Sequence, residues 1–297
     1  MCHESTRQAF RNKYEQGQRE LRYGFGFAGR TVILFGVLGF GIPGFVPTPF
    51  DCFHQVVRAE TGRQEHIGLN GDYVKGYVSN TKAIITSPMH WKGAQWKEAL
   101  LIVGITAAIY PLDPEVKEEV QEGRNSASNR LAGIARHFGE GQYVAAPLGV
   151  LYLYGHFKGD DTAEETALLS VESLAVSGLF TGAVKNLSHR NRPSSGYPFD
   201  VWHGPELSLK NLSFPSGHSA AAFSLATVVA SEYANNGYIP PAAYGIATLT
   251  ALSRVNDNAH WTMPTGFPMY FSARRWDILP QKLLSACITT RKQRYYP

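Results

Sequence analysis

The chain has 297 residues, of which 44% are hydrophobic and 18% are charged, and its formal net charge is +4 at pH 7. This composition is too polar for a protein made mostly of membrane spans, and the length suits one large helical domain or two small ones. The mild basic excess suits an anionic substrate or a membrane surface. The sequence has no basic stripe of the kind expected for nucleic-acid binding. Its three scattered cysteines suggest neither a zinc site nor a disulfide framework.

Residues 1–50 begin as a polar extension and continue into an apolar run at 31–46. A basic residue, Arg30, precedes this run, as in a secretion signal, but the run is short for a membrane span and contains Pro43. We therefore expect an export signal or membrane anchor here, with a buried hairpin as the alternative. Residues 51–96 are polar and turn-rich, and we expect them to lead into the main domain at 97–262.

From residue 97 onward, apolar and small residues recur in helix-like segments that glycine and proline separate. The predicted helices are 97–110, 115–138, 143–157, 162–188, 219–235 and 241–254. Strand patterns are weak, and 166–184 is the one apolar stretch of this domain that approaches the length of a membrane span. We predict an all-α helical bundle in which small residues permit close packing of the helices.

A first group of candidate functional residues lies at the end of the predicted helix 162–188. Lys185 and Arg192 are seven residues apart, and Pro193 follows. Residues at this spacing lie on one helical face two turns apart, so we expect both cations to point at one anion. Arg192 can bind phosphate oxygens bidentately, and Lys185 supplies a compact point charge.

Two further groups follow at successive helix ends. Ser216, Gly217 and His218 stand in the sequence Pro-Ser-Gly-His before a predicted helix, whose N-terminus offers unpaired N–H groups to an anion. The next predicted helix closes on Arg254 and is followed by His260, an imidazole that can attack phosphorus. Each feature alone has an ordinary explanation, such as helix capping. The three in this order indicate a phosphate site, with His218 placed to protonate a departing alkoxide.

Together, the patterns K-x6-RP, PSGH and SR-x5-H resemble the signature of the type 2 phosphatidate phosphatase and vanadium haloperoxidase superfamily, over roughly residues 97–260. The resemblance implies a helical phosphatase that needs no metal or other cofactor and forms a phosphohistidine intermediate. It implies that His260 is the nucleophile and His218 the general acid. The phosphate-binding residues that it implies are Lys185, Arg192, Ser216, Gly217 and Arg254.

The resemblance fails directly after His260. The family places an aspartate four residues after the nucleophile, where it orients the imidazole, and this chain has Pro264 there. Residues 263–297 are basic and broken by prolines, so the last core helix of the family is expected to be lost. A reading frame that starts at the third base of the Met263 codon permits Ala-His-Trp-x-Ser-Asp and then a small-residue helix. We therefore hypothesise that the tail is translated out of frame, and that the chain as printed has severely impaired activity.

Three functions are compatible with these residues. The first is hydrolysis of a lipid phosphate or small phosphate ester by a periplasmic or membrane-associated protein. The second is vanadium-dependent halide oxidation, because vanadate mimics the phosphoryl transition state in the same pocket. The third is phosphate binding without catalysis by a membrane-associated family member. His156, His189 and His203 match no motif position, and we interpret them as structural.

The hypothesis about the tail predicts the result of resequencing the coding DNA from His260 to the stop codon. We expect the third bases of the codons to spell His-Trp-x-Ser-Asp in the shifted frame. Third bases that spell another sequence there would rule the hypothesis out.

Overall fold

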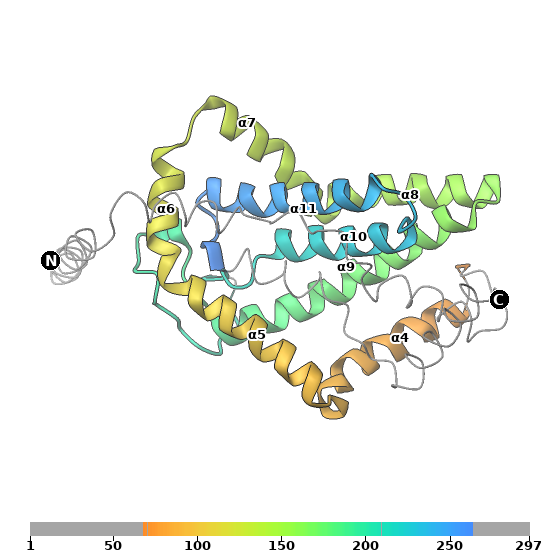
Figure 1. Cartoon of the computed structure of the whole chain (residues 1–297), viewed down its shortest axis with the longest axis horizontal. Helices are drawn as coiled ribbons and strands as arrows, with labels where there is room; N and C mark the ends of the chain where they lie inside the picture. Colours follow the sequence, from red (N-terminus) through yellow and green to blue (C-terminus); the bar gives the residue numbers. More distant parts are fainter. Residues whose placement is uncertain (1–67, 70, 209, 264–297) are drawn as a thin grey trace, which may run out of the picture. The chain divides into compact units, whose positions relative to one another are not determined.

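The computed structural model describes residues 68–69, 71–208 and 210–263, so the expected signal or anchor in residues 1–50 and the tail at 264–297 lie outside the described residues. Within the described ranges the regular elements are helices, and the extended backbone pairs only in an isolated bridge between Arg190 and Trp202. This confirms the predicted all-α class (Figure 1). The elements in chain order are α4 (Gly71–Thr86), η1 (Ser87–His90), α5 (Gly93–Ile109), η2 (Tyr110–Leu112), α6 (Asp113–Glu122), α7 (Ser126–Ala135), η3 (Arg136–Gly139), α8 (Gly141–Lys158), α9 (Asp161–Ser188), η4 (Pro193–Ser195), α10 (Gly217–Glu232) and α11 (Ile239–Asn256).

Two predicted elements differ from the structure. The single helix expected at 115–138 is wrong, because the chain breaks after α6 and starts α7 at Ser126. The side chain of Asn125 causes the new start by accepting hydrogen bonds from the N–H groups of Ala127 and Ser128, which are unpaired donors of the first turn. The segment 51–96, expected to be turn-rich, contains the helix α4.

The helices α8 and α9 form a hairpin with a close contact near the turn. Gly159 provides the turn with a left-handed backbone (φ 68°), which glycine adopts without strain. A Cβ atom at Gly155 would lie 2.5 Å from the backbone nitrogen of Glu164, so only glycine permits this approach of the two helices. At Gly155, a small residue permits close packing of α8 and α9, as predicted.

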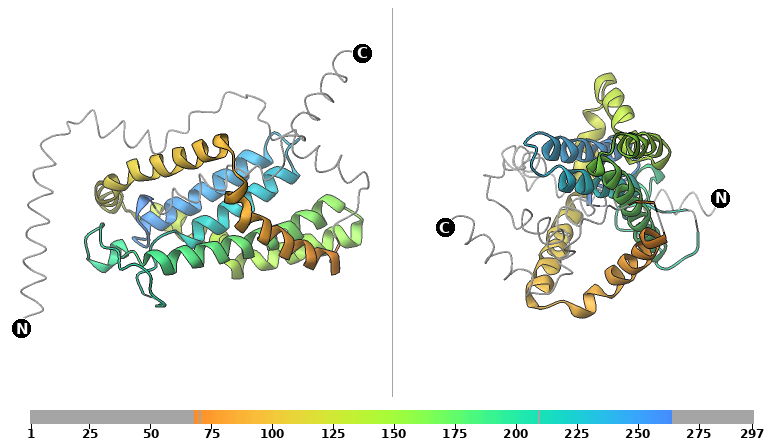
Figure 2. Two further views of the ribbon diagram at one scale, coloured as in Figure 1. Left: turned by 90° about the horizontal axis from the view of Figure 1, so that it is seen from below. Right: turned by 90° about the vertical axis from the view of Figure 1, so that its right-hand side faces the viewer.

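The helix α10 packs against both α9 and α11, which lie alongside it in two views (Figures 1 and 2). Its contact with α11 is built from small side chains around one aromatic ring. The buried cluster there consists of Ala222, Phe223, Ala226, Ala247 and Ala251. Alanine at most of these positions lets the helix axes approach closely and fixes the ends of α10 and α11 relative to each other.

Two helical stretches are long and apolar enough to cross a membrane, judged by length and composition. They are Asp161–Ser188, which corresponds to the apolar run expected at 166–184, and Gln95–Glu122, which the sequence did not single out. The second arises because α5, η2 and α6 follow one another without an extended residue between them. Large apolar side chains along α5, including Leu100, Leu101 and Val103, are exposed.

Gly139, at the end of η3, sits directly against the backbone of α10. A Cβ atom there would lie 2.6 Å from the carbonyl oxygen of His218 and 2.8 Å from its Cα. Because backbone atoms cannot rotate away, we expect Gly139→Ala to lower the free energy of unfolding by about 1–3 kcal/mol in chemical denaturation. Gly141→Ala is the matched control, since a Cβ at Gly141 meets nothing within 4 Å. Equal stability of the two variants would contradict this packing.

Candidate functional site

The first motif does not lie on one helical face. The helix α9 ends at Ser188, because His189 takes a left-handed conformation (φ 41°) and reverses the chain. Arg192 therefore lies outside the helix in extended backbone (φ −80°, ψ 151°), and the expected two-turn spacing of Lys185 and Arg192 is wrong. Pro193 lies five residues after the end of the helix.

The loop nevertheless returns Arg192 to the neighbourhood of Lys185. The charges of Arg192 and Arg254 both act on the ammonium group of Lys185, whose Nζ donates a hydrogen bond to the carbonyl oxygen of Leu212 at 2.8 Å. The guanidinium of Arg192 is exposed and makes no hydrogen bond or ion pair with any described residue. The two cations of the first motif therefore come together through the loop, and Arg192 has its donors available for an anion.

The second motif forms the N-terminus of α10, which begins at Gly217. Ser216 is the N-cap: its fully buried hydroxyl oxygen accepts hydrogen bonds from the N–H and the hydroxyl of Ser219. Its own hydroxyl proton is left for a further acceptor. The N–H groups of Gly217 and His218 belong to the first turn, where no carbonyl of the helix can reach them. A Cβ at Gly217 would be 3.8 Å from Lys185 Cε, which shows how close α9 and α10 lie here.

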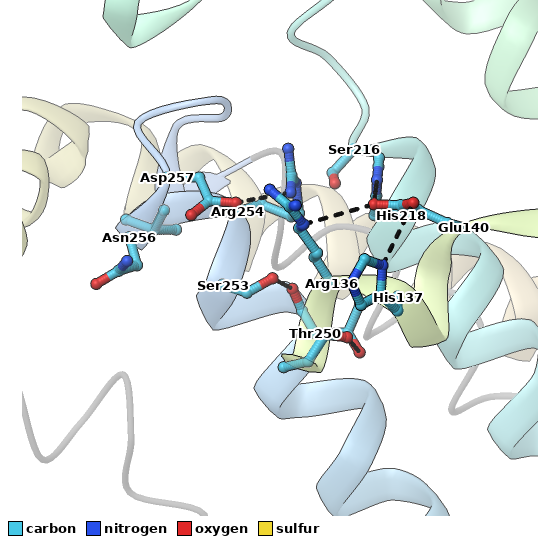
Figure 3. A network of polar contacts seen from close by, with 12 residues as sticks. Arg136, His137, Glu140, Ser216, His218, Thr250, Ser253, Arg254, Asn256 and Asp257 are labelled. Carbon is cyan, nitrogen blue, oxygen red and sulfur yellow. Dashed lines mark hydrogen bonds and ion pairs between the residues drawn. The ribbon is translucent and has the colours of Figure 1, made fainter. Parts of the chain in front are cut away.

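Arg254, in the last turn of α11, brings a second guanidinium to this place. Its Nη1 donates to Asp257 at 3.0 Å, while its buried Nε has no partner among the described residues. Burial lowers the pKa of Arg254, and the nearby charge of Asp257 opposes this shift. Figure 3 shows Arg254 of α11 beside Ser216 and His218 at the start of α10. An anion bound between them would meet donors from α10 and α11 together.

His260 is buried just after α11, and its ring orientation is defined by one hydrogen bond. The Nδ1 atom lies 2.7 Å from the carbonyl oxygen of Ser213. A carbonyl can only accept, so Nδ1 carries the proton and Nε2 keeps a lone pair. Burial, together with the charges of Lys185, Arg192 and Arg254, holds the pKa of His260 well below its usual value. The imidazole is therefore neutral at pH 7.

His218 lies in the first turn of α10, partly exposed, and faces a carboxylate that sequence reasoning missed. Its Nε2 is 3.6 Å from Oε1 of Glu140, the N-cap residue of α8, which also lies 3.5 Å from Nδ1 of His137 and 3.7 Å from Nε of Arg136 (Figure 3). Burial and the charges of Arg254 and Lys185 lower the pKa of His218 to about 4, and Glu140 opposes this shift. No spacing rule connects Glu140 to the motifs, since 78 residues separate it from His218.

Asp113 and Arg190 are a second pair that the sequence did not reveal. Both side chains are fully buried, and Nη2 of Arg190 donates to Oδ2 of Asp113 at 2.7 Å. The other oxygen, Oδ1, accepts the backbone N–H of Met263 at 2.7 Å. Arg190 stands inside the six unspecified residues of the first motif, and only a buried arginine without an expected partner could have drawn attention to it.

The ring nitrogens of the three histidines interpreted as structural contact groups other than the candidate site residues. Both ring nitrogens of His189 lie within 3.1 Å of backbone carbonyl oxygens, which hold its left-handed turn. His203 contacts the side-chain oxygen of Asn191 at 3.2 Å, and His156 lies 3.6 Å from Glu164.

Comparison with known proteins places this site in a family. Residues 166–265 match the family model of the PAP2 superfamily, and this range contains all seven candidate site residues. A lipid A 1-phosphatase from Porphyromonas gingivalis is 42% identical over 50 residues, which are 16% of this chain and 11% of that protein. The chain thus spans about a ninth of the length of this curated relative.

A crystal structure of a transmembrane PAP2 type phosphatidylglycerolphosphate phosphatase from Bacillus subtilis is also similar. The match has 18% sequence identity and a TM-score of 0.47, and covers 66% of this chain and 95% of that one. We draw no argument from this likeness. The family model agrees with the resemblance of the three motifs: residues 166–265, about a third of the chain, match the PAP2 superfamily.

Proposed function

We propose that this protein hydrolyses phosphate monoesters through a phosphohistidine on His260. One observation carries the proposal: the neutral ring of His260 donates its Nδ1 proton to Ser213, which leaves a lone pair on Nε2, and the charges of three cationic side chains act on this ring. A nucleophile without charge beside uncompensated positive charge is suited to attack a phosphate dianion.

Binding of the phosphate group falls to the cations and to the start of α10. Lys185, Arg192 and Arg254 supply positive charge, and Ser216 with the N–H groups of Gly217 and His218 supplies fixed donors. In the pentacoordinate transition state the equatorial oxygens gain negative charge, so these donors bind it more tightly than the ground state.

Chemistry then proceeds in two steps. Nε2 of His260 forms a bond to phosphorus while the bond to the ester oxygen breaks, and the leaving alkoxide takes a proton from the protonated form of His218, which its lowered pKa restricts to acidic pH. Neutral His218 next removes a proton from water, whose oxygen attacks phosphorus and breaks the P–N bond. Inorganic phosphate leaves, and both histidines return to their starting protonation states.

A lipid phosphate is the substrate class that we favour. The curated relative with 42% identity over 50 residues is a lipid A 1-phosphatase. The two apolar helical stretches, Gln95–Glu122 and Asp161–Ser188, support association with a membrane, where such a substrate is found. Localisation in the periplasm or at its membrane is part of the same proposal, and no metal or organic cofactor is required for the steps above.

Assays with two substrates that differ in leaving group test the function. The purified full chain is given p-nitrophenyl phosphate or dodecyl phosphate, and the variant Pro264→Asp, which restores the expected carboxylate, is measured in parallel. We expect slow turnover by the chain as printed and faster turnover by Pro264→Asp, by up to about four orders of magnitude. His260→Gln should abolish both turnover and acid-labile labelling by ³²P. Turnover that survives His260→Gln would contradict the role of His260 as nucleophile.

Vanadate-dependent halide oxidation without phosphatase activity would favour the haloperoxidase, and vanadate binding with neither activity would favour the inactive binder.

The contact between Glu140 and His218 predicts a change in the pH profile. Glu140 opposes the lowering of the His218 pKa by burial, Arg254 and Lys185, so Glu140→Gln should lower this pKa further. The alkaline limb of kcat/KM then moves to lower pH, and turnover of dodecyl phosphate above that limb falls by about tenfold for each pKa unit.

p-Nitrophenyl phosphate should be affected less by this change, because its leaving group departs without a proton. Glu122→Gln is the matched control, because Glu122 is an exposed carboxylate at the end of α6. An equal loss with both substrates would show that Glu140 does not act through proton donation.

A further inference from the structure

Two side-chain contacts at His260 and Trp261 lead to one short segment, Arg190 and Asn191. The carbonyl oxygen of Arg190 accepts the N–H of Ser213 at 3.0 Å, and Ser213 in turn accepts the ring proton of His260. The carbonyl oxygen of Asn191 accepts the indole N–H of Trp261 at 2.8 Å. The acceptor of the ring and the residue after it therefore depend on the position of the same two residues.

The side chain of Arg190 extends this connection to Asp113. Its guanidinium is enclosed by three aromatic rings, with centroids 4.9 Å away for Tyr110, 5.0 Å for Trp202 and 5.4 Å for Trp261. It also donates from Nε and Nη2 to the carbonyl oxygen of Phe199. A guanidinium held on so many sides can move little, so its ion pair with Asp113 fixes the carboxylate in place.

Asp113 in turn holds the chain after the nucleophile. Its carboxylate accepts the N–H of Met263 at 2.7 Å, and the N–H of Thr262 also stabilises the charged form. These hydrogen bonds attach to the residues directly before Pro264, where the family has its orienting aspartate. A carboxylate from α6 thus restrains the backbone at the place where this chain lacks a carboxylate of its own.

We propose that Asp113, held by Arg190, is a positioning residue for His260 that fixes the segment at residues 260–263 and so keeps the ring on Ser213. The catalytic part of this role rests on the proposed function, whereas the restraint on the ring does not. Asp113 acts through the backbone of Thr262 and Met263 and does not touch the substrate.

The test needs variants that remove the carboxylate without unfolding the protein. Asp113→Asn leaves Arg190 buried without a counter-charge and is expected to lower the melting temperature strongly. Replacing both partners with apolar residues, Asp113→Leu with Arg190→Met, removes the buried charges together and is expected to retain the fold. Glu115→Gln, an exposed position on the same helix, is the matched control.

Nitrogen NMR of ¹⁵N-histidine-labelled full chain reads the ring of His260 directly, with His260→Gln to assign its signals. We expect a single tautomer protonated on Nδ1 in the parent and in Glu115→Gln, and a mixture of tautomers in the double variant. Orthovanadate affinity should fall about tenfold or more, and where turnover is measurable kcat should fall by about a hundredfold with a smaller change in KM.

A folded double variant with an unchanged His260 tautomer and unchanged vanadate affinity would overturn the proposal and leave Asp113 a purely structural residue. A lower melting temperature with an unchanged ring signal would have the same meaning. If the parent neither binds vanadate nor hydrolyses esters, the proposed function fails, but the histidine spectrum still decides whether Asp113 positions the ring.

Discussion

Positive charge without an equal counter-charge is the constraint around which this site is arranged. Lys185, Arg192 and Arg254 act on one another, and burial further disfavours the charged forms of Lys185 and Arg254. Such a cluster is unfavourable in the unliganded protein, so the rest of the fold must hold it together. The close contacts of α9, α10 and α11 through glycine, alanine and serine do this. An anion would relieve the repulsion, which makes the phosphate binding that we propose a consequence of the packing.

The two histidines respond to this charge in different ways. Burial and the cations keep His260 neutral, which a nucleophile requires. The same influences lower the pKa of His218, which a proton donor must resist. Glu140 is the carboxylate placed against His218, and no described carboxylate lies against the ring of His260. The difference in partners, a carboxylate for one ring and a carbonyl for the other, matches the acid and nucleophile roles that we propose.

The motif residues could be found from the sequence. The geometry that brings them together could not be predicted from it. Lys185 and Arg192 were grouped on a helical face that does not exist, because the left-handed His189 ends α9 early, and no sequence pattern marks that position. They meet because the loop after α9 folds back, which depends on contacts with Trp202, Phe199 and Asp113. Asp113 and Glu140 were missed for a related reason. Each acts across a long sequence separation, and each looks locally like an ordinary acid at a helix start. Residues that act through tertiary contacts leave no periodic signal.

The contacts described for His260 indicate what a proline in place of an aspartate at position 264 would cost. The ring proton is accepted by Ser213, the neighbouring indole by Asn191, and the following N–H by Asp113, so every one of these restraints comes from residues before Pro264. The contacts that assemble the candidate phosphate-binding residues therefore do not involve position 264, where the family places an aspartate. What a neutral carbonyl cannot supply is the negative charge that stabilises an imidazole as it becomes cationic on bonding to phosphorus. The loss should consequently fall on kcat, while phosphate and vanadate binding persist. This separates a damaged enzyme from a protein that has lost its site.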